Sequence, residues 1–295
     1  MKKKFTADTV VKIVILVICL IICSLFIWGI VKMVSRLTHY GESTSIGQVE
    51  PEQGNNGEND GQQTVSMEDL LPRNAYDYSC FFDENGLKRY ETDTVIGLPG
   101  IDVSSYQGEI DWKAVRDAGV EFAMIRLGYR GYASGELDLD DCFQSNMEGA
   151  QAVGLPVGVY FFSQALNEEE AVQEAEYVLE YLQGYELQYP VIFDWEEIAV
   201  DARTDDMNMV LLTGCAKAFC ETIEQAGYEA GVYFNQEYGY TQMNLQSLKD
   251  YYFWLAEYRE NPTFYYDFQM WQYTNEGHVP GIPEQVDLNI AFFNK

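Results

Sequence analysis

The chain has 295 residues, of which 47% are hydrophobic, and this is enough for one large folded domain with attachments. Its formal net charge is −29 at pH 7, and residues 1–39 hold six basic residues and one acid, so the remainder is strongly acidic. This charge excludes nucleic-acid binding by phosphate neutralisation. With two histidines and no Cys-x-x-Cys pair, the sequence predicts no metal site, and we expect no cofactor.

The first part of the chain predicts a membrane anchor. Ile13–Val31 is a run of nineteen residues without a charge, long enough to cross a bilayer as a helix, and we assign the anchor to residues 13–34. The lysines before the run outnumber the basic residues after it, which makes residues 1–12 a cytoplasmic tail and places the bulk of the chain outside the cell. A cleaved signal peptide is the alternative, although no small-residue cleavage site follows the run.

Two segments connect this anchor to the main domain. Residues 40–66 are rich in Gly, Asn, Gln and Glu with almost no large apolar side chains, which is typical of a disordered linker. Residues 67–95 carry leucine and aromatic side chains and an Asn85-Gly86 pair that favours a hairpin turn. We expect a lead-in segment that packs on the main domain and adds stability rather than chemistry.

From residue 96 to residue 295 the chain alternates strands with helices. The expected strands are Gly100–Val103, Glu121–Leu127, Pro156–Phe162, Tyr189–Glu196, Ala230–Phe234, Tyr252–Leu255, Phe268–Tyr273 and Val286–Ala291. The expected helices are Asp111–Ala118, Asp140–Val153, Glu168–Gln183, Asp205–Ala226 and a short one at Leu245–Lys249. Repeated strand–helix units predict a parallel sheet, and eight strands suit a closed α/β barrel of the TIM type with fewer helices in its last third. An open doubly wound sheet is the alternative, but no glycine-rich phosphate loop follows the first strand.

Acidic side chains stand on three of these strands. Asp194 and Glu196 follow the buried run Val191–Phe193, and side chains two apart on a strand point to the same side, about 6–7 Å from each other. Asp102 ends the first strand and Asp287 lies on the last, and these strands are neighbours in a closed barrel. A single acid at a strand end is ordinarily a helix cap or a solvated residue, but four at one barrel mouth repel each other and indicate function. Carboxylates with separated pKa values are what glycosidic bond cleavage needs.

Four motifs follow one another in a specific order along the chain. They are Gly100-Ile101-Asp102-Val103-Ser104-Ser105-Tyr106-Gln107-Gly108, Asp194-Trp195-Glu196, Trp271-Gln272-Tyr273 and Val286-Asp287-Leu288-Asn289. Together they resemble glycoside hydrolase family 25, the CH-type lysozymes or N-acetylmuramidases. The resemblance covers about residues 98–295 and implies a flattened eight-stranded barrel that lacks late helices. The chain departs from it at Phe162, where many members carry a polar or imidazole side chain.

The resemblance also implies roles for single residues. Glu196 resembles the general acid, and we expect burial and the nearby acids, Asp194 above all, to raise its pKa. Asp194 resembles the carboxylate that stabilises the positive centre, directly or through the acetamido group of the substrate, and Asp102 and Asp287 resemble flanking acids that bind substrate and tune the pair. The residues expected along the groove are Tyr160, Trp195, Tyr233, Glu257, Tyr258, Trp271 and Gln272. Core packing is an equally good explanation for each aromatic ring among them.

The expected function is therefore a membrane-tethered, extracytoplasmic muramidase. It would hydrolyse the β-1,4 bond between N-acetylmuramic acid and N-acetylglucosamine, with peptidoglycan strands and the lipid bilayer as its partners. One alternative is a non-catalytic peptidoglycan-binding or scaffold protein built on the same barrel. Another is a glycosidase of different specificity, such as a chitinase, but Val191–Phe193 stands where family 18 chitinases have alternating aspartates.

Overall fold

The computed structural model describes residues 71–295 of the chain. The predicted cytoplasmic tail, membrane anchor and linker lie outside the described residues, as does the start of the lead-in segment. Within residues 71–295, no helix combines the length and the apolar character that a membrane span requires.

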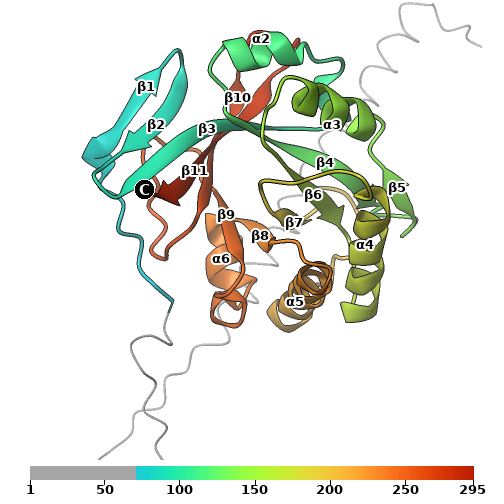
Figure 1. Ribbon diagram of the computed structural model, residues 1–295. Helices are drawn as coiled ribbons and strands as arrows, with labels where there is room; N and C mark the ends of the chain where they lie inside the picture. Colours follow the sequence, from blue (N-terminus) through green and yellow to red (C-terminus); the bar gives the residue numbers. More distant parts are fainter. Residues whose placement is uncertain (1–70) are drawn as a thin grey trace, which may run out of the picture. The chain divides into compact units, whose positions relative to one another are not determined.

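Eight strands close into a barrel at the centre of the described chain (Figure 1). They are β3 (Val95–Val103), β4 (Phe122–Arg130), β6 (Val157–Ser163), β7 (Val191–Trp195), β8 (Ala230–Asn235), β9 (Tyr252–Ala256), β10 (Met270–Gly277) and β11 (Val286–Asn294). The order around the barrel is β3-β11-β10-β9-β8-β7-β6-β4, and the pairing of β4 with β3 closes the ring. This confirms the predicted eight-stranded α/β barrel over the open sheet.

The last strand differs from the all-parallel prediction. β10 and β11 form an antiparallel pair, and β11 is also antiparallel to β3. A parallel connection needs a crossover of a dozen or more residues, and the segment 278–285 between β10 and β11 is too short for one. β11 therefore brings the start of the strand, and not its end, to the mouth of the barrel.

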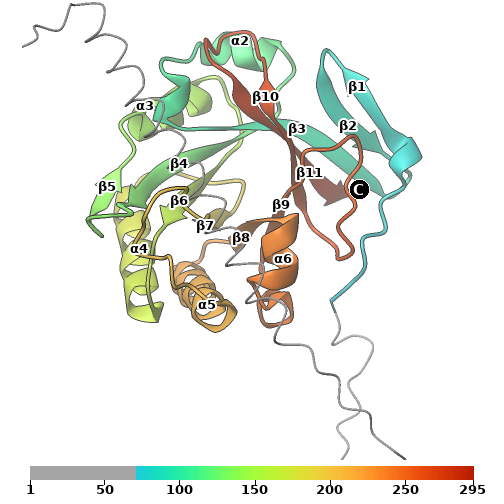
Figure 2. The same cartoon turned by 180° about the vertical axis from the view of Figure 1, so that it is seen from behind.

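Helices cover the barrel unevenly (Figure 2). The helices α2 (Trp112–Asp117), α3 (Phe143–Ala152), α4 (Glu168–Tyr181) and α5 (Met209–Gln225) follow the first four barrel strands, and the short α6 (Gln236–Thr241) follows β8. The predicted helix at 245–249 is a 3-10 turn, η4 (Leu245–Leu248), and the segment between β9 and β10 contains no helix. This confirms the prediction that helices become fewer in the last third.

Two boundaries show how local chemistry sets these elements. Helix α5 begins at Met209 rather than at Asp205, because the side chain of Asn208 accepts hydrogen bonds from the backbone amides of Val210 and Leu211 and caps the first turn. A short strand that was not predicted, β5 (Leu137–Leu139), pairs antiparallel with the end of β4. This pair extends the sheet beyond the barrel as an arm.

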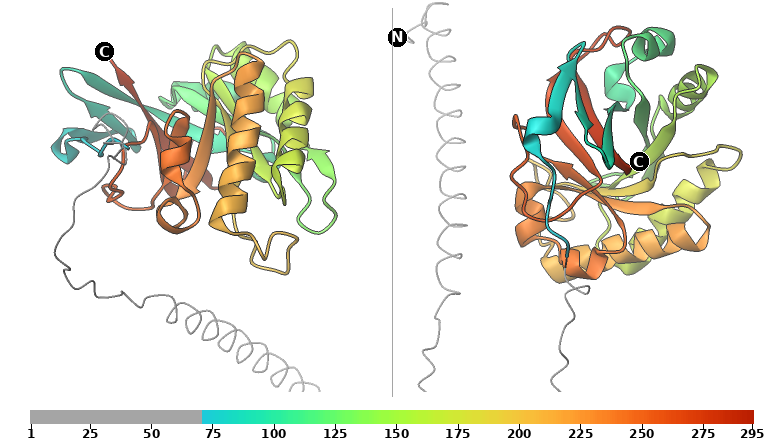
Figure 3. Two further views of the ribbon diagram at one scale, coloured as in Figure 1. Left: turned by 90° about the horizontal axis from the view of Figure 1, so that it is seen from below. Right: turned by 60° about the vertical axis from the view of Figure 1, so that its left-hand side comes forward.

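A hairpin precedes the barrel and extends its sheet. It consists of β1 (Phe81–Glu84) and β2 (Leu87–Glu91), preceded by the 3-10 turn η2 (Tyr78–Cys80). Asn85 and Gly86 form its turn, both with positive φ, at 56° and 83°. β2 pairs with β3 and lies close to β11 (Figure 3), and the ring of Tyr76 stacks on Phe292 with the centroids 4.0 Å apart. The described lead-in residues thus pack on the barrel.

The alternation of side chains along the strands divides the core into two layers. On β7, Val191 and Phe193 belong to the large cluster that packs towards the helices, whereas Ile192 belongs to a smaller cluster inside the barrel. On β4, Met124 is likewise inside, while its neighbours belong to the outer cluster. Because side chains alternate along a strand, Asp194 points into the barrel like Ile192, and Trp195 points towards the helices like Phe193.

Candidate active site

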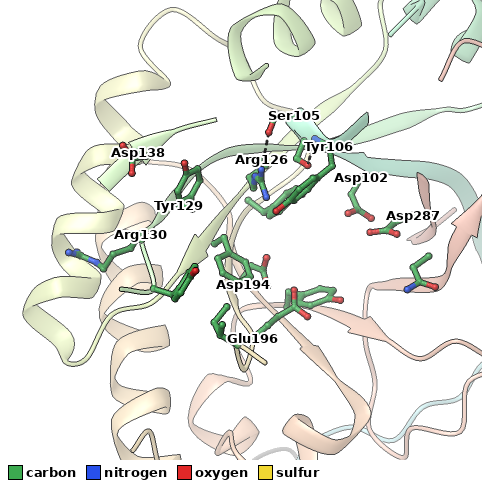
Figure 4. A pocket seen from close by; sticks show the side chains of 18 of the residues that line it. Asp102, Ser105, Tyr106, Arg126, Tyr129, Arg130, Asp138, Asp194, Glu196 and Asp287 are labelled. Atoms are coloured by element: carbon green, nitrogen blue, oxygen red, sulfur yellow. Dashed lines mark hydrogen bonds between the residues drawn. The ribbon is translucent and has the colours of Figure 1, made fainter. Parts of the chain in front are cut away.

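A pocket of about 1040 Å³ lies at the mouth of the barrel. All four acids predicted from the sequence line it: Asp102, Asp194, Glu196 and Asp287 (Figure 4). Asp102 and Asp194 are each only 5% exposed, so their carboxyl groups are almost fully removed from water. The structure therefore brings together the four carboxyl groups that the sequence places on separate strands.

Asp102 and Asp287 lie directly opposite each other across the β3–β11 pair. Gln272 connects them, because its Nε2 donates to Asp102 Oδ2 at 2.9 Å and to Asp287 Oδ2 at 3.3 Å. Asn289 Nδ2 donates a further hydrogen bond to Asp102 Oδ2 at 2.7 Å. Two amide side chains thus direct their N–H groups at one carboxylate, as a negative charge there requires.

Aromatic donors fix the orientation of both amides. The hydroxyl groups of Tyr233 and Tyr258 each donate to Gln272 Oε1 at 2.9 Å, and Trp254 Nε1 donates to Asn289 Oδ1 at 2.9 Å. Each amide oxygen is therefore occupied, and only the nitrogen can face the acids. Trp254 and Asn289 were not among the predicted site residues, although both continue the interior alternation of their strands.

The pair of Asp102 and Asp287 holds a proton. Burial raises the pKa of Asp102, and the hydrogen bonds from Asn289, Gln272 and Asp287 act against that rise. Burial and then the charge of Asp102 raise the pKa of Asp287 to about 9. At neutral pH Asp287 is therefore protonated and donates to Asp102.

Asp194 and Glu196 form the second pair. Burial first, and then the charge of Asp102, raises the pKa of Glu196. Burial, followed by the charge of Glu196, raises the pKa of Asp194 well above its ordinary value, while Arg126 acts against this rise. Burial raises the pKa of Glu196 as predicted, but the acid that adds to this rise is Asp102 and not Asp194. The charge of Glu196 instead raises the pKa of Asp194. Within the described residues, the buried atom Asp194 Oδ1 has no hydrogen-bond partner.

Four of the seven predicted groove residues line the pocket, namely Tyr160, Tyr233, Tyr258 and Gln272. Phe162, the point of departure from the family pattern, lines it as well and gives it an apolar stretch of wall. The other three, Trp195, Glu257 and Trp271, are not among its lining residues. These three belong to the framework around the site.

The positions of these three residues follow from strand alternation. Trp195 lies between Asp194 and Glu196 and points outwards, where its ring packs against Tyr238 with the centroids 5.5 Å apart. Trp271 is the outward neighbour of Gln272, and its Nε1 donates to the backbone oxygen of Glu257 at 2.8 Å. The carboxylate of Glu257 accepts hydrogen bonds from the backbone amides of residues 263 and 264 and so holds its own loop.

A set of polar residues that was not predicted lines the pocket towards the β4–β5 arm. Arg126 is the interior residue two positions after Met124, and its Nε donates to Asp140 Oδ2 at 2.8 Å. The buried Asp140 also accepts from the backbone amides of Ser105 at 3.1 Å and Cys142 at 2.9 Å. A basic residue on the interior side of an apolar strand was the sequence signal for this part of the site.

A buried glutamine holds the chain at Glu196. Gln164 Nε2 donates to the backbone oxygen of Glu196 at 3.2 Å, and Gln164 Oε1 accepts from the hydroxyl of Thr204 at 2.7 Å. The side chain therefore joins the end of β6 to both ends of the segment that follows β7. Gln164 was not predicted, because nothing in the sequence around it indicates these distant partners.

The chemistry available at this site is proton transfer and stabilisation of positive charge. Within residues 71–295, no group of three or more histidine, cysteine or acidic side chains is arranged to hold a metal ion. The pocket combines carboxyl groups whose pKa is raised by burial with Asp102, which accepts hydrogen bonds from two amide side chains. This combination suits general acid catalysis next to a developing cation.

Comparisons with known proteins place these residues in a family context. Residues 101–282 match the family described as glycosyl hydrolases family 25. The autolytic lysozyme of Clostridium acetobutylicum is 26% identical over 193 residues, which are 65% of this chain and 55% of that protein. This span includes less than two thirds of the relative, so the comparison concerns part of that protein.

Solved structures share the fold. The modular autolysin LytC of Streptococcus pneumoniae matches with a TM-score of 0.59 at 26% identity, over 72% of this chain and 52% of that one, and has also been solved with a synthetic peptidoglycan ligand. A family 25 glycosyl hydrolase from Bacillus anthracis matches with a TM-score of 0.54 at 25% identity, over 66% of this chain and 88% of that one. The chain spans about half the length of the lysozyme and of LytC.

Proposed function

Since this chain belongs to the glycosyl hydrolases of family 25, we propose that it is a muramidase, which hydrolyses the β-1,4 bond between N-acetylmuramic acid and N-acetylglucosamine in peptidoglycan. The observation that carries this proposal is the convergence of four carboxyl groups on one pocket. Cleavage of a glycosidic bond needs a proton donor and a second carboxyl group beside the same bond. The lysozyme relative and the peptidoglycan complex of LytC support peptidoglycan as the substrate.

Glu196 is the proton donor in this mechanism. Burial and the charge of Asp102 raise its pKa, which favours the protonated carboxyl group, and its side chain is less buried than that of Asp194. A protonated acid with access to the cavity can transfer its proton to the leaving glycosidic oxygen as the bond breaks. The negative charge of Asp102 assists, because it is one of the causes of the raised pKa.

Asp194 stabilises the positive charge that develops on the sugar. Asp194 lines the pocket, and its buried Oδ1 has no hydrogen-bond partner within the described chain. Asp194 acts as a carboxylate in this step, and the positive charge that develops on the sugar beside it favours that ionised form. The Oδ1 atom can act on the sugar carbon directly or orient the acetamido group of the substrate.

The test of this function is the exchange of Glu196 for Gln. Glu196→Gln keeps the shape and removes the proton, and we expect the rate to fall by about 10²–10⁴-fold while glycan binding is kept. Asp194→Asn is expected to lower the rate strongly as well. The measurement is the release of reducing ends from purified peptidoglycan, with mass spectrometry of the products to identify the bond that is cleaved.

The neighbouring acid provides a matched control. Glu197 is exposed and does not line the pocket, so Glu197→Gln is expected to keep activity within a few-fold. Normal hydrolysis by Glu196→Gln, or inactivity of Glu197→Gln alone, would contradict the assignment of the proton donor. A wild-type chain that binds glycan but releases no reducing ends would be a binding protein and not a muramidase.

We also propose that residues 13–34 tether this enzyme to the cell membrane, with residues 40–66 as a spacer and the barrel on the outer side. The support is the uncharged run Ile13–Val31 and the greater number of lysines before it than of basic residues after it. A single-pass anchor with this orientation would hold the pocket on the side of the membrane where peptidoglycan lies.

A further inference from the structure

An exposed tyrosine lines the pocket next to Arg126, apart from the catalytic pair. Tyr106 is 77% exposed although it belongs to the pocket wall, and Figure 4 shows it between Arg126 and Asp102. Single exposed rings are common on protein surfaces and need no functional explanation. A functional role for Tyr106 therefore has to be argued from the contacts that fix its backbone and its ring.

The backbone that carries Tyr106 is fixed on both sides. Tyr106 belongs to the 3-10 turn η3 (Ser105–Gln107), in which Ser104 and Gln107 form a reciprocal capping box. Ser105 N donates to the buried Asp140 at 3.1 Å, and Gln107 Nε2 donates to the backbone oxygen of Gln285 at 3.2 Å. The turn is thus tied to the β4–β5 region on one side and to the segment before β11 on the other.

A guanidinium group supports the ring. The Cζ atom of Arg126 lies 5.0 Å from the centroid of the Tyr106 ring. Arg126 is itself held by Asp140 through Nε at 2.8 Å and by Ser105 Oγ through Nη2 at 3.2 Å. Tyr106 is therefore supported by a fixed cation, while most of its surface remains open at the pocket.

From this arrangement we propose that Tyr106 is a stacking platform for a sugar ring of the bound glycan strand. The ligand class is a β-1,4-linked N-acetylhexosamine chain, so the inference rests on the proposed function. The C–H groups on one face of such a sugar ring form an apolar surface that packs on an aromatic ring. A tyrosine side chain has few rotatable bonds and therefore loses little conformational entropy on binding. Tyr106 would bind a sugar and take no part in proton transfer.

The test compares Tyr106→Ala with Tyr106→Phe in the full-length chain. Binding is measured by calorimetry in the Glu196→Gln background with short glycan strands prepared from purified peptidoglycan, and KM and kcat are measured in the otherwise unchanged enzyme. We expect Tyr106→Ala to raise Kd and KM about tenfold with a smaller change in kcat, because ring contacts of this kind are worth roughly one factor of ten. Tyr106→Phe keeps the ring and is expected to stay within about twofold of wild type on the same reasoning.

A matched control and three outcomes make the test decisive. Phe82 on β1 is 45% exposed and does not line the pocket, so Phe82→Ala should leave Kd and KM unchanged. Unchanged Kd and KM in Tyr106→Ala, with wild-type hydrolysis intact, would overturn the platform and leave the muramidase assignment standing. Equal weakening by Phe and Ala would overturn stacking in favour of a hydroxyl contact. Absence of hydrolysis by wild type would overturn the proposed function, while the binding series still decides on the platform.

Discussion

Asp102 links the two carboxyl pairs of the site. It accepts hydrogen bonds from Gln272 and Asn289, and its charge contributes to the raised pKa of both Asp287 and Glu196. A residue in this position controls protonation on two neighbours without having to touch the scissile bond. Its removal should therefore be visible in the pH dependence of the enzyme as well as in the rate.

We predict that Asp102→Asn moves the basic limb of the kcat/KM profile to lower pH. Activity requires protonated Glu196 and is lost as pH rises through its pKa, and the charge of Asp102 raises that pKa. Loss of the charge lowers the pKa, so the decline begins at lower pH. The measurement is hydrolysis of purified peptidoglycan across a pH series at constant ionic strength.

The same exchange at a distant acid is the control for this prediction. Asp93 is exposed in the turn before β3 and does not line the pocket, so Asp93→Asn should leave both limbs in place. A basic limb that stays fixed in Asp102→Asn, or moves to higher pH, would mean that Asp102 does not set the protonation of Glu196.

At the scale of elements, the end of β6 positions the segment that follows β7. Gln164 holds the backbone at Glu196 through one atom and Thr204 through another. We predict that Gln164→Leu lowers kcat about 10- to 100-fold with KM nearly unchanged, because small displacements of a reacting group cost this much. Thr204→Val removes one of the two bonds and should have a smaller effect in the same direction.

The readout for Gln164 has to separate positioning from general damage. Gln164 carries no charge, so the pH limbs of Gln164→Leu should match those of wild type. A variant with reduced thermal stability but a normal kcat would show that Gln164 supports the fold alone.

The apolar pattern of the strands determined how much of the fold could be predicted. Runs such as Val191–Phe193 on β7 are long enough to mark a buried strand, and eight of them in order imply a barrel. An apolar run has no direction, however, so the antiparallel orientation of β11 could not be read from the run itself. The short segment 278–285 carried that information. β5 was missed because Asp138 separates its two leucines, so no apolar run marks this strand.

Strand alternation explains which site residues could be predicted. The rule that pairs Asp194 with Glu196 also turns Trp195 away from the pocket, and the same rule separates Trp271 from Gln272. Stricter use of it would have excluded both tryptophans and included Arg126. Gln164 is different, because its partners are far away in sequence and only the folded chain brings them together.

At the scale of the whole molecule, the acidic charge of the chain opposes its approach to anionic surfaces, whereas the proposed anchor would hold it at one. The net charge of −29 repels anionic lipids and wall polymers, although ordinary salt screens this repulsion beyond about 8–10 Å. A linker over residues 40–66 with the properties of a flexible coil has a root-mean-square span of roughly 30 Å. The proposed tether at residues 13–34 would keep the acidic barrel near a surface that repels it.

We predict that the full-length chain sediments with membranes and stays there in high salt, because an apolar helix and not charge holds it. A chain without residues 1–39 should remain in the supernatant. Fractionation with a salt wash and a detergent wash gives this answer, and mass analysis of the native N-terminus tests it independently. A mature chain that starts near Tyr40 would show that the apolar run is a signal peptide.

The β3–β11 closure has a consequence for how the protein is made. The bond from Asn289 to Asp102 joins residues 187 positions apart, so the acid network combines an early part of the barrel with a late one. Contacts of such long range form late in folding, because the loop between them must first be closed. A nascent chain lacks Asp287 and Asn289 until the last strand of the barrel, β11, has been synthesised. The complete site therefore forms only after β11 has been synthesised and the barrel has closed.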